Sequence, residues 1–245
     1  MNELVSFSLG IAPGMALIVL AYLLVRAVRE PLLRIGILIL GFILLRDAMT
    51  PAGLWSFGLV DGIVPWLRMT DNIVVLLGFG LGSLGIVALT LLDAPLRTLL
   101  PHGRPPLVAL PWGMIGGVVA AAPVLALSTG TPLSERGGEV ALSVLPFLLF
   151  MCLAGNLGEE FFFRGYLQGR LMQLTSGLRA ALISAVLFAV CHSFLALNLT
   201  DVGWPLLAFT LWEGLICALL RWRVGLSAAV LAHGLAIFLL SAGLL

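Results

Sequence analysis

The sequence predicts an all-α, polytopic membrane helix bundle of about eight transmembrane helices, forming a single integral membrane domain over residues 1–245. Of the 245 residues, 61% are hydrophobic and only 10% are charged, and the mean hydropathy is +1.15. Soluble domains are about 45–50% apolar and about 25% charged. The apolar runs are long and do not alternate with polar residues. Since a bilayer requires backbone groups to be satisfied internally, helices are favoured over strands.

A spanning helix needs about 20 mainly apolar residues. The predicted spans are 4–25, 32–45, 73–92, 107–127, 140–157, 180–197, 203–220 and 225–244. The second is the weakest, because only eleven residues separate Arg34 from Arg46. Its ends must therefore snorkel to the interface, or the helix must continue past them. Residues 47–72 contain Trp55 and Trp66 and are expected to form an interfacial loop or a surface helix, since Trp favours the headgroup region.

The arginines predict the orientation in the membrane. They concentrate in the loops after the first, third, fifth and seventh spans: Arg26, Arg29, Arg34, Arg97, Arg104, Arg164, Arg170, Arg179, Arg221 and Arg223. The positive-inside rule makes these loops cytoplasmic and puts both termini outside. All 13 basic residues are Arg, which suggests a bacterial source and therefore a bacterial inner (plasma) membrane. Because Glu3 and no basic residue precedes the first apolar run, that run is expected to be retained rather than cleaved as a signal.

The remaining composition excludes two classes of function. A net charge of +1 gives no footprint for binding nucleic acid, so the expected partners are the lipid bilayer and a membrane-associated substrate. The three cysteines, Cys152, Cys191 and Cys217, all lie in apolar runs without paired spacing, which argues against a disulfide framework or a zinc knuckle. The oligomeric state is left open by the sequence.

The first candidate site motif is Glu159-Glu160-x-x-x-Arg164. On a helix Glu160 and Arg164 share a face, so the arginine can hold this carboxylate ionised. Glu159 is turned about 100° away and lies in a poorly hydrated place beside a second negative charge, as suits a general base. The alternative reading is a cluster of charges at the cytoplasmic interface, where the predicted apolar span ends.

Two histidines interrupt the later spans. His192 follows Phe188 by one helical turn, so the aromatic ring can fix the orientation of the imidazole. Cys191 points about 100° away from His192, which disfavours a thiol dyad. His233 lies in an otherwise apolar span. Neutral imidazoles can stabilise an oxyanion or relay protons, although a lone helical histidine is more often a core residue.

These motifs in this order resemble the CPBP family, which includes CAAX proteases and bacteriocin-processing enzymes. The resemblance covers residues 140–245, the predicted catalytic core, and leaves residues 1–139 as additional N-terminal spans; Gly214 and the 221–227 turn also look like that family. It implies an intramembrane endopeptidase in which Glu159 and His192 activate a water, His233 helps to stabilise the oxyanion, and Arg164 anchors Glu160. Members act on prenylated CAAX proteins, bacteriocins or C-terminal sorting tags; a bacterial source disfavours the prenylated class.

The sequence departs from the family pattern at one position. Family members usually carry an Asn one turn after the last His, where this chain has Ile237. Asn156 and Ser193 are the candidates to replace the missing oxyanion donor. Glu213, in the seventh span, has no counterpart in the resemblance and is expected to pair with Arg164 or a histidine, or to contact substrate.

A metal-free mechanism is favoured, with zinc as the alternative cofactor. Two Glu and two His can complete a zinc site. However, the sequence has no His-Glu-x-x-His motif, and Arg164 would compete with a cation for the carboxylates.

Two other functions stay open at this stage. A non-catalytic peptide-binding or immunity membrane protein would use the same polar residues to shape a pocket. A proton-coupled transporter would use them as a relay, but it predicts broken helices in two related halves, and the chain shows no such symmetry.

Overall fold

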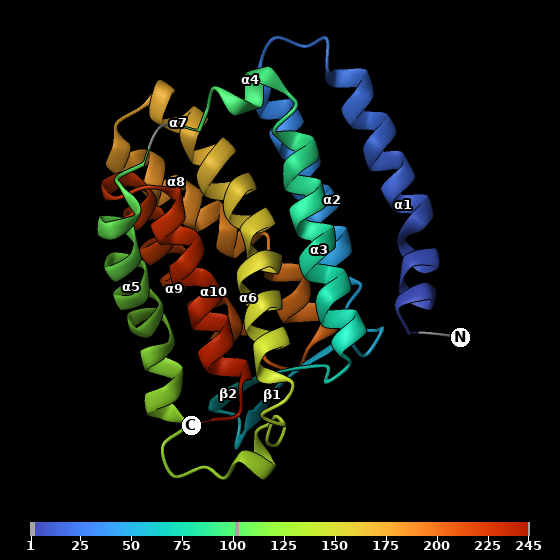
Figure 1. The fold of residues 1–245 in the computed structure, drawn as a ribbon, viewed down its shortest axis with the longest axis vertical. Helices are drawn as coiled ribbons and strands as arrows, with labels where there is room; N and C mark the ends of the chain where they lie inside the picture. The colour runs from blue at the N-terminus through green and yellow to red at the C-terminus, as the bar shows by residue number, and fades with distance from the viewer. Residues whose placement is uncertain (1–2, 101–102, 245) are drawn as a thin grey trace.

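The computed structural model describes residues 3–100 and 103–244 as a bundle of long helices (Figure 1). The long helices are α1 (Glu3–Val25), α2 (Pro31–Asp47), α3 (Ile73–Thr90), α5 (Pro106–Leu127), α6 (Leu145–Glu160), α8 (Gly177–Val190), α9 (Trp204–Arg223) and α10 (Leu226–Ser241). Shorter segments are α4 (Ala94–Arg97), the 3₁₀ turn η1 (Leu133–Glu135), the π-helices η2 (Phe161–Leu167) and η3 (Leu195–Leu199), and α7 (Gln168–Leu174). The all-α fold class is therefore confirmed.

Six helical segments of the described chain are long and apolar enough to cross a membrane by length and composition. The two remaining predicted spans correspond to α2, with 17 residues, and α10, with 16. The protein is an integral membrane protein. In α2 the helix continues through both flanking arginines, and their side chains are buried, with residue exposures of 5% for Arg34 and 4% for Arg46. Both arginine side chains therefore point into the protein and do not extend to the membrane interface.

The segment between α2 and α3 differs from the prediction of a loop or surface helix. It contains an antiparallel hairpin of β1 (Trp55–Val60) and β2 (Val64–Met69). Asp61 and Gly62 form the turn, both with positive φ, which matches the preference of tight hairpin turns for Asp-Gly. The indole of Trp55 donates to the hydroxyl of Thr50 at 2.7 Å. The hairpin closes one end of the bundle (Figure 1).

The helix that carries the glutamate pair is longer than expected. The predicted span ended at residue 157, but α6 continues through η2 into α7, and 145–174 is one apolar segment of 30 residues. Glu159 and Glu160 thus lie midway along a continuous helix and do not end it at an interface. The π-helical stretch begins directly after them, and such local π-turns often occur at functional sites.

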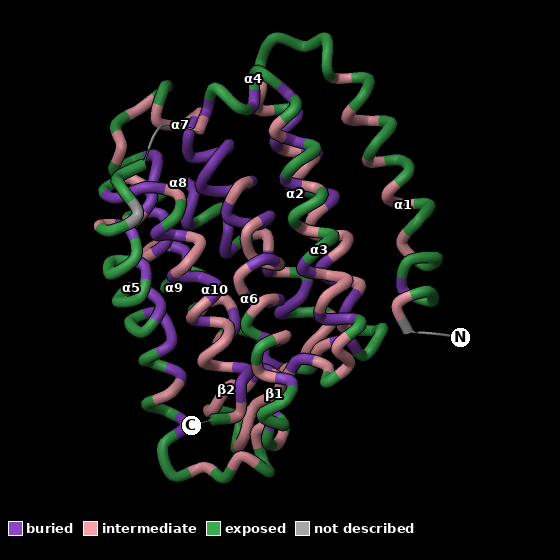
Figure 2. The backbone as a smooth tube through the Cα atoms, viewed as in Figure 1, coloured by how far each residue is buried: buried purple, intermediate pink, exposed green. Residues whose placement is uncertain are grey.

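The later helices form the interior of the bundle. α10 lies between α5 and α6, α3 packs along α6, and α8 packs along α9 (Figure 1). α1 leans mainly on α2, and among its described side chains only Phe7 is buried, as the predominance of exposed and intermediate colours on this helix shows (Figure 2). Both ends of the described chain lie at the hairpin end. The arginine-rich loops lie at the opposite end.

Candidate active site

The two adjacent glutamates have different surroundings, as helical geometry predicts. Glu160 is fully buried, and its Oε1 lies 2.8 Å from Nη1 of Arg164 and 2.9 Å from Nδ1 of His233. Glu159 faces a cavity and makes no contact that close: its Oε1 lies 3.6 Å from Nε2 of His192, and its Oε2 lies 3.8 Å from Nε2 of His233. One carboxylate is thus fixed inside the protein and the other is presented to the cavity.

Arg164 is held from three sides without any exposure. Besides the ion pair with Glu160, its Nη2 donates to the carbonyl of Gly214 at 3.2 Å, and the guanidinium lies 4.0 Å from the ring centre of Phe188. A Cβ at position 214 would lie 3.1 Å from Phe188 and 3.4 Å from the guanidinium. Gly214 therefore lets α9 approach closely enough for its backbone to bind Arg164.

His192 follows the end of α8, and its surroundings define its tautomer. Nδ1 lies 2.8 Å from the carbonyl of Phe188, and because a carbonyl can only accept, Nδ1 is the donor. In the neutral imidazole Nε2 is then an acceptor, and this is the nitrogen that faces Glu159. The rings of Phe188 and His192 lie 4.6 Å apart between centroids. The expected contact with Phe188 is present, and a backbone hydrogen bond adds to it.

His233 connects the buried carboxylate to the cavity. Its Nδ1 contacts Glu160, while Nε2 lies 3.8 Å from Glu159 and 3.7 Å from Oε2 of Glu213. Glu213, which the sequence left unassigned, therefore lies nearest to a histidine and also lines the cavity. The ring of Phe188 packs edge-on against His233 at 5.8 Å.

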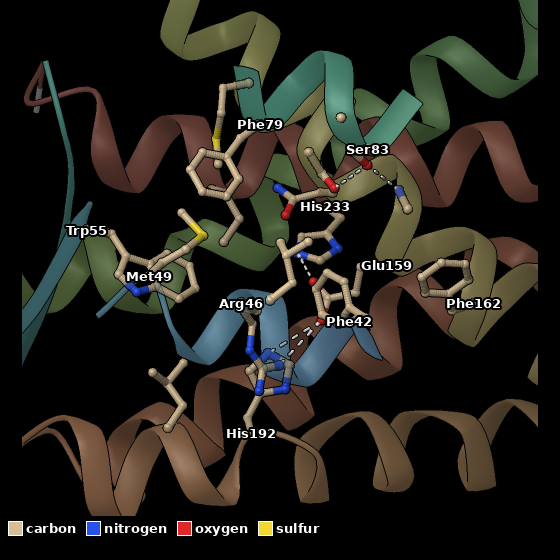
Figure 3. Close-up of a pocket in the computed structure, with 18 of the residues that line it drawn as sticks. Phe42, Arg46, Met49, Trp55, Phe79, Ser83, Glu159, Phe162, His192 and His233 are labelled. Atoms are coloured by element: carbon tan, nitrogen blue, oxygen red, sulfur yellow. Dashed lines mark hydrogen bonds and ion pairs between the residues drawn. The ribbon is translucent and has the colours of Figure 1, made fainter. Parts of the chain in front are cut away.

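All five predicted site residues come together in one buried cluster drawn from the 145–174 helix, the end of α8, and α10. Glu159, His192 and His233 line a cavity of about 520 Å³, whereas Glu160 and Arg164 lie behind it. Most of the other lining side chains are apolar and come from α1, α2, α3 and the hairpin. In Figure 3 the two imidazoles and Glu159 meet at the wall of this cavity.

Sequence reasoning missed Arg46 as a site residue. The guanidinium lines the same cavity, and its Nη1 lies 3.7 Å from Oε1 of Glu159 (Figure 3). In the sequence Arg46 is a charged residue at the edge of an apolar span, a position that indicates a span boundary. No local spacing links it to Glu159, because α2 and α6 are far apart in the chain.

The arrangement of donors does not suit a zinc ion. Among residues 3–100 and 103–244, no group of three or more His, Cys, Asp or Glu is placed to hold a metal. The Arg46 guanidinium faces the same Glu159 oxygen as His192. A fixed cation in that place competes with a metal for the carboxylate.

A buried glutamate and two imidazoles meet at a cavity within a membrane bundle, and the family comparison gives the class of protein. Residues 141–239 match the family model described as type II CAAX prenyl endopeptidase Rce1-like. The matched segment is similar to the CAAX-type intramembrane endopeptidases, which supports an enzyme over the transporter and non-catalytic alternatives. No curated protein and no solved structure matches the chain. The matched segment includes all five predicted site residues and Ile237 but excludes Arg46.

Proposed function

We propose that the protein hydrolyses a peptide bond of a membrane-associated protein or peptide, with Glu159 and His192 activating the attacking water. The observation that supports this proposal is the 3.6 Å approach of Glu159 Oε1 to His192 Nε2 at the cavity wall. With Nδ1 of His192 donating to Phe188, both facing atoms are hydrogen-bond acceptors. A water bound between them donates one hydrogen to each and directs a lone pair into the cavity.

The reaction then follows general acid–base chemistry. The water oxygen attacks the carbonyl carbon of the substrate while Glu159 takes its proton. The tetrahedral intermediate collapses as the bond between carbon and nitrogen breaks, and the departing nitrogen takes the proton from Glu159. The products are a carboxylic acid and an amine, so one water is consumed and the enzyme regains its starting protonation.

The remaining predicted residues support this pair. Arg164 neutralises Glu160, and Glu160 fixes the ring of His233 through Nδ1, so that Nε2 points toward Glu159 and the cavity. We assign His233, as the doubly protonated imidazolium that donates from Nδ1 to Glu160, to stabilising through Nε2–H the charge that develops on the substrate oxygen. Glu160 and Arg164 do not line the cavity, and their proposed role is positioning.

The proposed substrate carries an apolar segment next to the scissile bond. The cavity is lined mostly by apolar side chains and runs beside α1, the helix least packed against the bundle. Removal of a C-terminal tag and bacteriocin maturation both supply such substrates, and prenylated CAAX proteins are those named for the family. We place the enzyme in the bacterial plasma membrane with the hairpin and both termini outside, according to the arginine distribution.

The test uses purified protein in liposomes with three quenched reporter peptides: a farnesylated CAAX peptide, a membrane helix with a C-terminal tag, and a bacteriocin precursor. Glu159→Gln and His192→Ala are each expected to abolish cleavage of whichever reporter the wild type accepts. Glu139→Gln, which neutralises an exposed glutamate far from the cluster, is the matched control and is expected to retain full turnover. Normal turnover by the Glu159 variant would refute the proposal, as would cleavage of none of the three reporters by the wild type.

A further inference from the structure

The guanidinium of Arg46 is fixed at the cavity by a set of contacts that the family match does not include. Arg46 lies near the end of α2, and only 4% of it is exposed. Nε and Nη2 both contact Oδ1 of Asp47, at 2.8 and 2.7 Å, and Nη2 also donates to the carbonyl of Cys191 at 2.8 Å. Two of its three nitrogens are therefore engaged in holding the plane of the group.

The third nitrogen, Nη1, lies on the side of the guanidinium next to Glu159. It is buried without a hydrogen-bond partner, and its nearest charged neighbour is Oε1 of Glu159 at 3.7 Å. A buried donor left without a partner is unfavourable, and more so when the group is charged. The described contacts thus leave Nη1 without an acceptor beside the proposed base Glu159.

We propose that Arg46 is a catalytic residue whose Nη1 donates to the carbonyl oxygen of the scissile bond and to the oxyanion that develops on it. This inference rests on the proposed function. The water lies between Glu159 Oε1 and His192 Nε2, and Arg46 Nη1 approaches the same Glu159 oxygen, so the carbonyl attacked by that water lies within reach of the guanidinium. A preorganised, charged donor in a poorly hydrated site stabilises an oxyanion strongly.

The other candidate donors are less well placed. Ile237 lines the cavity one turn beyond His233 and has no hydrogen to donate. Asn156 lines the cavity, but one hydrogen of its Nδ2 donates to the carbonyl of Cys152 at 2.8 Å, which ties the amide to its own helix and leaves a single hydrogen for a substrate; Ser193 is not among the lining residues. Arg46 therefore supplies the donor that Ile237 does not, from a helix outside the matched segment.

A purely structural role for Arg46 is the competing explanation, since the cation also faces Glu159. The two roles differ in the transition state. A donor to the oxyanion binds a tetrahedral analogue much more strongly than the uncleaved peptide, whereas a structural role affects both equally. The readout is therefore the inhibition constant of a phosphinate analogue of the accepted reporter, compared with KM for the reporter.

The first experiment measures Arg46→Gln, Arg46→Lys and Asn156→Leu in liposomes. Arg46→Gln is expected to lower kcat about 10²–10³-fold, which is the usual cost of one oxyanion donor. The phosphinate should bind weaker by a similar factor while KM changes little. Arg46→Lys keeps the charge without the planar fork and is expected to lie between Gln and wild type. A large loss in Asn156→Leu together with normal kcat in Arg46→Gln would transfer the role to Asn156 and overturn the proposal.

The second experiment is a rescue. Ile237→Asn places an amide at the same cavity from α10. In the Arg46→Gln background it is expected to recover at least tenfold of the lost kcat. Recovery would show that Arg46→Gln lost a hydrogen-bond donor and not its fold. Size-exclusion profiles check that each variant is folded. If Arg46→Gln, Arg46→Lys and the rescue variant all show the same reduced kcat and the same raised KM, Arg46 is structural and the proposal fails. The proposed function is tested separately, and it stays intact in that case if Glu159→Gln is inactive.

Discussion

Glu160 and His233 lie 73 positions apart in the sequence, and their side chains meet at 2.9 Å between Oε1 and Nδ1. Glu160 has no exposed surface and does not line the cavity, so its only route to the chemistry is through the ring of His233. The same oxygen lies 2.8 Å from Arg164, which makes a chain from α9 through η2 and α6 to α10. The predictions below test this chain and the elements around it.

Removing one partner of the Glu160–Arg164 ion pair is expected to destabilise the protein strongly. Arg164→Met leaves Glu160 buried with only His233 beside it, and losing one partner of a buried ion pair costs about 3–5 kcal/mol. The double variant Glu160→Gln with Arg164→Met removes both charges and should recover at least half of that loss. Denaturant unfolding in detergent measures both variants, and a double variant no more stable than Arg164→Met would contradict the pairing.

A single methyl group at position 214 should disturb the site. Gly214→Ala places a Cβ 3.1 Å from Phe188 and 3.4 Å from the guanidinium of Arg164, so one of them must move by a few tenths of an ångström. We expect kcat to fall about tenfold, because misplacing a positioned group by a fraction of an ångström is costly. Gly85→Ala in α3 is the matched control, since its Cβ would meet nothing within 4 Å. Equal turnover of both variants would show that the close approach of α9 is unimportant.

Removal of metal ions is expected to leave activity unchanged. The Arg46 guanidinium lies 3.7 Å from Oε1 of Glu159, and a fixed cation there competes with a metal ion for the carboxylate. Wild-type protein treated with EDTA and with 1,10-phenanthroline should retain full turnover, and elemental analysis should find less than stoichiometric zinc. Loss of turnover that only added Zn²⁺ restores would reverse this conclusion.

The contact between Asp93 and Arg34 should make stability depend on pH at the arginine-rich end of the bundle. Burial raises the pKa of Asp93, but hydrogen bonds from Tyr22, the Leu96 amide and Arg34 outweigh it and leave the pKa below its usual value of 3.8. A carboxylate with a lowered pKa in the folded state stabilises above the unfolded pKa and loses that contribution as the pH falls. The stability difference between wild type and Asp93→Asn should therefore be constant from pH 7 to about 5 and narrow below about pH 4. A difference that grows on acidification would contradict this sign.

The fold class and the cluster of five site residues were predictable because both depend on local signals. Long apolar runs predict helices in a bilayer, and Glu159, His192 and His233 stand out as ionisable groups within them. The hairpin was missed because the apolar and aromatic residues around Asp61-Gly62 suit a headgroup layer as well as a strand. The continuation of α6 was missed because charge at 159–164 resembles the end of a span, although these groups are buried against one another.

Arg46 was out of reach for a different reason. Its importance comes from a contact between α2 and α6 that no periodicity encodes. The ion pair with the neighbouring Asp47 is also enough to explain a charged residue at position 46.

The contact between Arg46 and Glu159 crosses the boundary of the segment by which the family is detected. The matched segment therefore meets, at its proposed base, a charged group that lies outside it. A chimera that joins residues 141–239 of this protein to the N-terminal helices of a relative would carry Ile237 but not Arg46. Its activity would depend on which side chain the relative has at the end of its second helix.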